Sequence, residues 1–266
     1  MSLNVCIAGA TGWVGRPLSL EISRADDLNL VGAVSRTHQG KRLGEVLNEP
    51  GLDLVISESV AEALETTKVD VLVDYTRPDV VKANVLTAIS RGVHVVIGTS
   101  GLSDKDFVEI NQAAIQNRVG VIAAGNFALT AVLLERFARE AAKYLSHWEI
   151  IDYASATKVD APSGVARELA FRLAEIKEPE TIYPVEKTMG DKESRGVALN
   201  GSQVHSIRLP GYIIALEVIF GAEDERLTIR HDAGGGAQPY LQGTLLAIRK
   251  VKNHRGLVRG LDNILE

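Results

Sequence analysis

Three glycines with a spacing of three residues, Gly9, Gly12 and Gly15, could bind the phosphates of a nucleotide. They follow an apolar run, residues 3–7, and precede Pro17, which suits the first turn of a helix. At such a strand-to-helix junction the first glycine permits a tight turn, the second lets the backbone approach a pyrophosphate, and the third lets the helix pack on the strand. Glycine-rich turns also close units that bind nothing, but the continued alternation of strand and helix patterns favours a dinucleotide site. Its predicted residues here are Gly9, Ala10, Thr11, Gly12, Trp13 and Val14.

The residues after the second apolar run, 30–34, indicate which dinucleotide would bind. An acidic residue at this place binds the 2′-hydroxyl of NAD, but the sequence here is Ser35-Arg36-Thr37-His38. An arginine among hydroxyls, with Lys41 and Arg42 nearby, can form charge-assisted bonds with a 2′-phosphate. We therefore expect NADPH as the cofactor, with NADH possible. The alternative is that Arg36 and its basic neighbours form only a solvated loop.

Three further apolar runs, residues 69–75, 93–97 and 119–124, are typical of strands buried in a parallel sheet. Ligands bind beyond the carboxyl ends of the strands in a doubly wound sheet, so the loops after these runs should complete the cofactor site. Its predicted members beyond the glycine turn are Arg36, Gly98, Thr99, Ser100, Ala124, Gly125, Asn126 and Phe127.

Helix signals separate these runs. Asp79 is expected to cap a helix that Gly92 closes, and Ser103 with Asp106 resembles a capping box for the helix that follows. The alternation of strand and helix predicts an α/β fold with a doubly wound parallel sheet, the Rossmann arrangement.

The pattern changes at residue 130. Helical periodicity over residues 130–145 and 162–176 is interspersed with strand patterns at 147–154, 203–209, 212–220 and 226–231. This order predicts a second, α+β domain. Residues 240–251 are again helical and could pack on the first domain. We therefore predict a dinucleotide-binding domain of residues 1–127 with 240–266, and a second domain of residues 128–239.

Composition argues against several classes of protein. The 266 residues are 45% hydrophobic and 24% charged, which suffices for one large or two modest cores. A net charge of −5, with dispersed basic residues, does not favour nucleic acid as a partner. No apolar run approaches the roughly 20 residues of a membrane span, and no signal-peptide pattern is evident. The single cysteine, Cys6, and the histidine spacing predict neither a disulfide nor a metal site. We expect a cytoplasmic protein without membrane, nucleic-acid or metal partners.

A second group with possible chemistry is the run Lys158-Val159-Asp160-Ala161-Pro162-Ser163-Gly164. Its last three residues begin a predicted helix, whose first backbone N–H groups are free to bind an anion. Lys158 adds a positive charge beside them. The pattern favours a site for a small anionic substrate, although a surface lysine by itself is usually only solvated.

This run closely resembles the signature of the 4-hydroxy-tetrahydrodipicolinate reductases, also called dihydrodipicolinate reductases, of the diaminopimelate route to lysine. Further segments match in the family's order: the glycine turn, Tyr75-Thr76-Arg77-Pro78, residues 97–101, Asn126-Phe127 and Glu225-Arg226-Leu227. The resemblance implies hydride transfer from NAD(P)H, and a second domain that binds substrate and joins a homotetramer through its sheet. It also implies substrate contacts in the lysine run and its flanks, for which the candidates are Lys158, Ser155, Ser163, Gly164 and Val165.

The chain departs from the family where a proton donor is expected. A histidine-rich run usually precedes the lysine, with one histidine proposed as the acid and its neighbour as a substrate ligand; Ala154 and Ser155 stand at those positions. General acid catalysis typically contributes roughly 10²–10⁴-fold, so another group must donate the proton or the rate falls. The catalytic candidates are Lys158 and Tyr153, and Asp152 and His231 are further possible donors.

We therefore expect an NADPH-dependent reductase that acts on a small cyclic imine or unsaturated dicarboxylate. Two alternatives remain open. One is a reductase of a different imine or oxo acid, since Val165 and Leu216 replace polar family residues. The other is a protein that binds NADPH without catalysis. Assays over a panel of imines and keto acids would distinguish them.

Overall fold

The computed structural model describes residues 2–265, which divide into two compact units. Residues 2–129 and 237–265 form the first unit, and residues 130–236 form the second. The helical pattern near the end of the chain forms α8 (Gln238–Lys250), which belongs to the first unit as expected.

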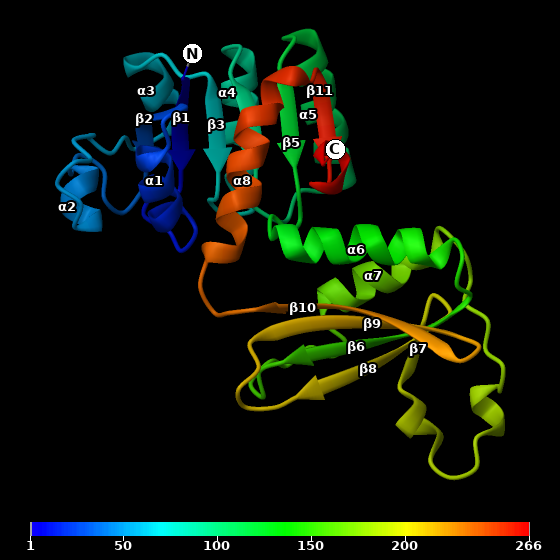
Figure 1. Ribbon diagram of the computed structural model, residues 1–266. Helices are drawn as coiled ribbons and strands as arrows, with labels where there is room; N and C mark the ends of the chain where they lie inside the picture. Colours follow the sequence, from blue (N-terminus) through cyan, green and yellow to red (C-terminus); the bar gives the residue numbers. More distant parts are fainter. Residues whose placement is uncertain (1, 266) are drawn as a thin grey trace. The chain divides into compact units, whose positions relative to one another are not determined.

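The first unit contains a six-stranded parallel sheet with the order β11-β5-β4-β3-β1-β2 (Figure 1). Its strands are β1 (Leu3–Ala8), β2 (Leu28–Val34), β3 (Val71–Asp74), β4 (His94–Ile97), β5 (Gly120–Ala123) and β11 (Gly256–Arg259). Because β2 and β3 flank β1 on opposite sides, the winding direction reverses at β1. The carboxyl ends of β1 and β3 therefore border a topological switch point, where doubly wound folds bind ligands. The predicted Rossmann arrangement is confirmed.

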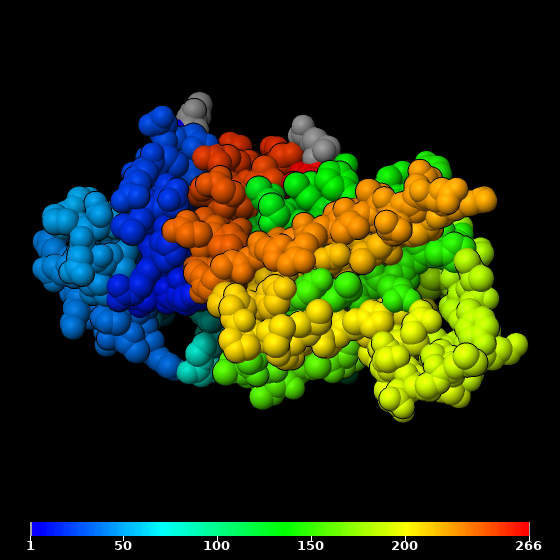
Figure 2. All heavy atoms as spheres, turned by 60° about the horizontal axis from the view of Figure 1, so that its bottom comes forward, coloured from blue at the N-terminus to red at the C-terminus, as the bar shows by residue number. Residues whose placement is uncertain are grey.

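The second unit contains a mixed sheet with the order β10-β9-β6-β8-β7. Its strands are β6 (His147–Ala154), β7 (Val197–Leu199), β8 (Ser202–Arg208), β9 (Ile214–Ala222) and β10 (Glu225–Ala233). The helices α6 (Leu129–Ala142) and α7 (Gly164–Ala174) cover one face, where Trp148, Ile150 and Phe220 are buried (Figure 1). Residues of β8 to β10, coloured yellow to orange, form part of the surface in Figure 2. The predicted α+β architecture is confirmed.

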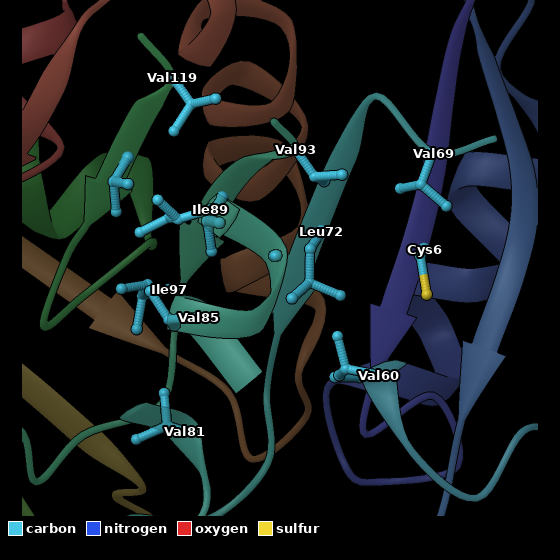
Figure 3. Close-up of a cluster of buried hydrophobic side chains, with 14 of the residues drawn as sticks. Cys6, Val60, Val69, Leu72, Val81, Val85, Ile89, Val93, Ile97 and Val119 are labelled. Atoms are coloured by element: carbon cyan, nitrogen blue, oxygen red, sulfur yellow. The ribbon is translucent and has the colours of Figure 1, made fainter. Parts of the chain in front are cut away.

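The core of the first unit explains why its strands read as apolar runs. Helices pack on both faces of the sheet, so successive side chains are buried on alternate sides. Side chains of α3 (Val60–Thr66), α4 (Val81–Ser90) and α5 (Asp104–Gln116) fill one face, and α1 (Gly15–Arg24) and α8 lie over the other (Figure 1). Figure 3 shows Cys6 among these apolar side chains. Burial raises the pKa of its thiol to about 12, consistent with the role of a small hydrophobe.

Helix starts follow the sequence signals in some places and not in others. Ser103 and Asp106 form the predicted capping box of α5, and Gly92 closes α4 with a φ of +73°. Asp79 does not cap α4, which begins after Val80 without a side-chain cap. Its carboxylate instead pairs with Arg77, and that hydrogen bond holds the pKa of Asp79 below its usual range. The prediction of a cap at Asp79 was wrong.

Several elements were not predicted, among them strand β7. Helix α3 is capped by the Ser59 side chain, which accepts from the amide of Glu62, while Glu62 accepts from the amide of Glu58 at 2.7 Å. The Ser-x-x-Glu spacing that signals this start is present in the sequence. Two other elements give weaker signals because they are short. The helix α2 (Leu43–Leu47) has five residues, and the edge strand β11, which pairs in parallel with β5, has four.

Candidate active site

The glycine turn of the first unit connects β1 to α1 with very close backbone contacts. Gly9 has a φ of +87°, and a Cβ there would lie 2.3 Å from the carbonyl oxygen of Tyr75. A Cβ at Gly15 would lie 2.0 Å from the carbonyl oxygen of Gly9. Both positions require glycine, and the turn therefore has the compact form that a dinucleotide-binding turn needs.

The start of α1 can receive a pyrophosphate. No side chain in the described chain caps this helix. The amide of Arg16 donates to the carbonyl of Gly12 at 3.0 Å and Pro17 has no N–H, so the amides that can meet an anion are those of the turn and of Gly15. Thr11 Oγ1 lies 2.7 Å from Ser35 Oγ, which ties the turn to the end of β2. Trp13 is 61% exposed, and its ring meets Tyr240 of α8 edge-on at 5.6 Å between centroids. The residues of the turn thus fit a dinucleotide.

Arg36 lies two residues after the end of β2 and is exposed, as a contact to the ribose end requires. Arg42 does not back it as expected, because its guanidinium forms an ion pair with Asp53. Fewer basic side chains are therefore available to a 2′-phosphate at the end of β2 than the sequence indicated.

A buried carboxylate organises the loops after β3 and β4. Asp74, which is fully buried, accepts hydrogen bonds from the backbone amide and hydroxyl of Thr76 at 3.0 and 2.6 Å. It also accepts from Thr99 Oγ1 at 2.7 Å and from Asn84 Nδ2 at 2.9 Å. Asp74 was not predicted as a site residue, although an acidic side chain at the end of an otherwise apolar strand is a signal for one. Asp74 fixes Thr99, a predicted cofactor residue.

The other predicted cofactor residues follow the carboxyl ends of β4 and β5. Phe127 is buried, and its ring lies 6.1 Å from that of Tyr75. The amide of Ala124 donates to Ile97 at 3.3 Å, and a Cβ at Gly125 would meet no atom within 4 Å. Since all these strands are parallel, the structure brings the glycine turn and these loops to one edge of the sheet. The predicted members at this edge include Gly98, Thr99, Ser100, Ala124, Gly125, Asn126 and Phe127.

In the second unit, Lys158 lies in the loop between β6 and α7. Its ammonium group is 2.7 Å from Asp160 Oδ1, and the pairing lowers the pKa of that carboxyl. The amide of Lys158 donates to the carbonyl of Ser155 at 3.0 Å, so residues 155–158 form a turn. Lys158 remains about a third exposed and can reach an incoming anion.

The start of α7 has fewer free groups than the sequence suggested. Ser163 caps the helix, and its amide and hydroxyl donate to Asp152 at 2.8 and 2.7 Å, so the structure commits them elsewhere. The side chain of Val165 packs on the core of the second unit, which leaves only its amide for a ligand. A Cβ at Gly164 would meet no atom within 4 Å, so the helix start is open there. The amides of Gly164 and Val165 can therefore receive a carboxylate.

The side chain of Tyr153 does not face the start of α7. Successive residues of a strand point to opposite faces, and Asp152 points to α7. The hydroxyl of Tyr153 donates to Glu217 at 3.1 Å, and the Arg230 guanidinium lies 4.6 Å from its ring centre. Its pKa is raised by burial and then by Glu217. This placement argues against the predicted role of Tyr153 as a catalytic residue.

The other possible donors are also engaged. Asp152 is fully buried and forms an ion pair with Arg208 at 2.7 Å. His231 Nδ1 lies 2.9 Å from Thr130 Oγ1, and burial lowers the pKa of its imidazole. Ala154, at the family's histidine position, is fully buried. Lys158 is thus the predicted donor that best combines a proton with access to the open start of α7.

Residues 2–265 contain neither a metal-binding cluster nor a membrane-spanning helix. No cluster of three or more His, Cys, Asp or Glu side chains has a geometry that could hold a metal ion. No helix of this range has the length and apolar character needed to cross a membrane.

A Rossmann sheet with a glycine turn that fits a dinucleotide, in a chain with a second α+β unit, is an architecture typical of pyridine-nucleotide-dependent oxidoreductases. Two family models match, "Dihydrodipicolinate reductase, N-terminus" over residues 3–127 and "Dihydrodipicolinate reductase, C-terminus" over residues 130–265. The chain therefore belongs to the dihydrodipicolinate reductase family.

Individual relatives agree with this assignment. A 4-hydroxy-tetrahydrodipicolinate reductase of Desulfitobacterium hafniense is 40% identical over 265 residues, 99% of each chain. The same enzyme of Moorella thermoacetica is 38% identical over 266 residues, 100% of this chain and 98% of its own. The solved structure of dipicolinate-bound dihydrodipicolinate reductase from a Paenisporosarcina species is 31% identical, covers 100% of both chains and has a TM-score of 0.89. An amine dehydrogenase of Mycobacterium smegmatis, 13% identical with a TM-score of 0.67, shares only the fold.

Proposed function

We propose that this protein is a 4-hydroxy-tetrahydrodipicolinate reductase that uses NADPH in the biosynthesis of diaminopimelate and lysine. The observation that carries the proposal is that the second unit has both an accessible ammonium group, at Lys158, and an open helix start, at Gly164. A small dicarboxylate needs such a positively polarised site. The family relationship supports the choice of substrate.

NADPH would bind at the edge of the first sheet. The glycine turn would hold the pyrophosphate through its own backbone amides and that of Gly15. Arg36 would contact the 2′-phosphate, since no acidic residue occupies this place to bind a 2′-hydroxyl. The loops that start at Gly98 and Ala124 would border the nicotinamide. When bound, the cofactor supplies a hydride for reduction of a C=C or C=N bond.

The residues of the second unit would bind and orient the substrate. A carboxylate would accept from the amides of Gly164 and Val165, and Lys158 would exchange its pairing with Asp160 for the same anion. Ser155, whose hydroxyl lies 3.0 Å from Thr157 Oγ1, is a further ligand candidate at the turn. Because Ala154 and Ser155 carry no imidazole, the proton that follows the hydride would come from Lys158 or from water.

We also propose a homotetramer that assembles through the second unit and works in the cytoplasm. The sheet face opposite α6 and α7 carries Ile151, Ile207 and Ile219, which are only partly buried. A second copy could cover them. Light scattering after size-exclusion chromatography should give four times the mass of the chain, and a monomer would disprove the assembly.

The direct test of the function is NADPH oxidation with freshly generated 4-hydroxy-tetrahydrodipicolinate. We expect turnover, and we expect pyridine-2,6-dicarboxylate (dipicolinate) to inhibit it competitively. Tight NADPH binding without turnover would instead support a protein that binds the cofactor only. Turnover confined to another imine or oxo acid would support the repurposed reductase. The full-length similarity to curated reductases favours neither alternative.

A further inference from the structure

A buried ion pair lies between the two parts of the proposed carboxylate site. Arg208 Nη2, on β8, is 2.7 Å from Asp152 Oδ2, on β6. The Asp152 side chain is completely buried and that of Arg208 is only 16% exposed. A carboxylate buried in this way cannot contact a substrate.

The acidic partner fixes the start of α7. Asp152 Oδ2 accepts from the amide of Ser163 at 2.8 Å and Oδ1 accepts from its hydroxyl at 2.7 Å. The same hydroxyl accepts from the amide of Ala166 at 3.3 Å. These bonds hold the first turn of the helix, and with it the direction of the amides of Gly164 and Val165.

The basic partner fixes the loop that carries Lys158. Arg208 Nη2 donates to the carbonyl oxygen of Asp160 at 2.8 Å, and Nη1 donates to the carbonyl oxygen of Asp152 at 3.1 Å. The Asp160 side chain in turn binds the Lys158 ammonium. One pair of side chains thus orients both the helix start and the lysine loop.

Stability alone does not explain this arrangement well. Desolvation of two charges often costs as much as their attraction returns, so apolar residues of similar volume would serve a purely structural role as well. Binding groups gain affinity when their supporting contacts hold them in place before the ligand arrives. The contacts of the pair fit that second role.

We propose that Arg208 and Asp152 are positioning residues that set the affinity for the substrate carboxylate without touching it. This inference rests on the proposed function, because it assumes that the anion binds at Lys158 and Gly164. The guanidinium is essential to it, because Arg208 donates to the Asp152 carboxylate and to the carbonyls of Asp152, Ile207 and Asp160. A lysine ammonium has only three donors and cannot make all four bonds.

The test compares wild type with Arg208→Lys, Asp152→Asn and the double variant. Arg208→Lys keeps the charge but loses the fork, and should raise both the KM for substrate and the Kd for dipicolinate about tenfold or more. We expect kcat within about threefold, and an unchanged Kd for NADPH, which binds the first unit. Because the two residues act as one unit, the double variant should lose little more than the worse single variant.

Arg172→Gln is the matched control. Arg172 lies near the other end of α7 and pairs with Glu168 at 2.8 Å, so its loss removes an ion pair from the same helix. It should leave KM and dipicolinate affinity unchanged. A fall in melting temperature for Arg208→Lys with KM and dipicolinate affinity within twofold of wild type would overturn the proposal, as would variants that fail to fold. A wild type that neither binds dipicolinate nor turns over would overturn the proposed function itself, and this inference with it.

Discussion

The ring of Tyr75 lies directly against the backbone of Gly98. A Cβ at Gly98 would approach Cε1 of that ring to 2.1 Å. The Tyr75 hydroxyl lies 2.7 Å from Thr244 Oγ1 of α8, and burial raises the pKa of the phenol. The ends of β3 and β4 and the C-terminal helix are thus locked together at the cofactor edge of the sheet.

This contact predicts that Gly98→Ala will damage cofactor binding. The new methyl group must displace the Tyr75 ring, and overpacking of this kind costs roughly 1–3 kcal/mol of unfolding free energy. We expect a lower melting temperature and at least about a tenfold higher Kd for NADPH by fluorescence titration. Gly51→Ala is the control, because a Cβ there meets no atom within 4 Å. Equal NADPH affinity in both variants would show that the contact is unimportant.

We expect the preference for NADPH over NADH to depend on Arg36. Replacement by Asp removes the partner for the 2′-phosphate and adds a repelling charge, while a carboxylate there can accept from a 2′-hydroxyl. Arg36→Asp should therefore weaken NADPH binding at least about tenfold more than NADH binding. Lys68→Asp serves as the control, because it makes the same charge change at an exposed residue before the amino end of β3, away from the cofactor edge. Equal losses for the two cofactors would exclude Arg36 as the selecting residue.

Tyr153→Phe tests the placement of Tyr153 away from α7. Its hydroxyl donates a hydrogen bond to Glu217. When the hydroxyl is removed, Glu217 still accepts a hydrogen bond from Arg230 at 3.1 Å. We expect kcat and KM within about threefold of wild type. A loss of kcat of roughly 10² or more would instead assign the proton transfer to Tyr153.

Acid should destabilise the protein through His94. Its Nδ1 accepts from the amide of Gly120 at 2.9 Å, and burial is the main reason that the pKa of its imidazole is lowered. The folded protein therefore takes up this proton less readily than the unfolded chain, whose histidine titrates at about 6.5. Above that pH His94 is neutral in both states and does not affect the pH dependence of stability. Below it the unfolded chain takes up the proton first, so the free energy of unfolding falls as the pH decreases from about 6.5 toward the lower pKa of the folded state. His94→Gln should show a smaller drop in melting temperature between pH 7 and pH 5 than wild type; an identical drop would rule out this site.

Much of the first unit could be predicted because its strands are buried on both faces and its turns need particular residues. Gly9 and Gly15 show this, since there is no room for a Cβ atom at either position. Asp79 shows the limit of local rules, because its carboxylate pairs with the guanidinium of Arg77 two residues away and does not cap α4.

The substrate half was harder to predict because its contacts are long-range. Arg208 lies 56 residues from Asp152, and nothing local in the sequence joins them. The orientation of Tyr153 depends on which sheet face the helices cover, which neighbouring residues do not reveal. Ser163 looked like a ligand because its partner Asp152 was unknown. The lysine run itself was recognisable because its residues are contiguous.

The most direct test of the account is the rate of NADPH oxidation by wild type and Lys158→Ala with 4-hydroxy-tetrahydrodipicolinate. Lys82→Ala is the control, because that lysine pairs with Asp106 and Glu109 in the first unit. We predict turnover by wild type and by the control, and at least about a hundredfold loss of kcat/KM in Lys158→Ala with NADPH affinity unchanged. Undiminished turnover in Lys158→Ala, or the absence of turnover in wild type, would contradict the proposed role of Lys158 and the proposed function.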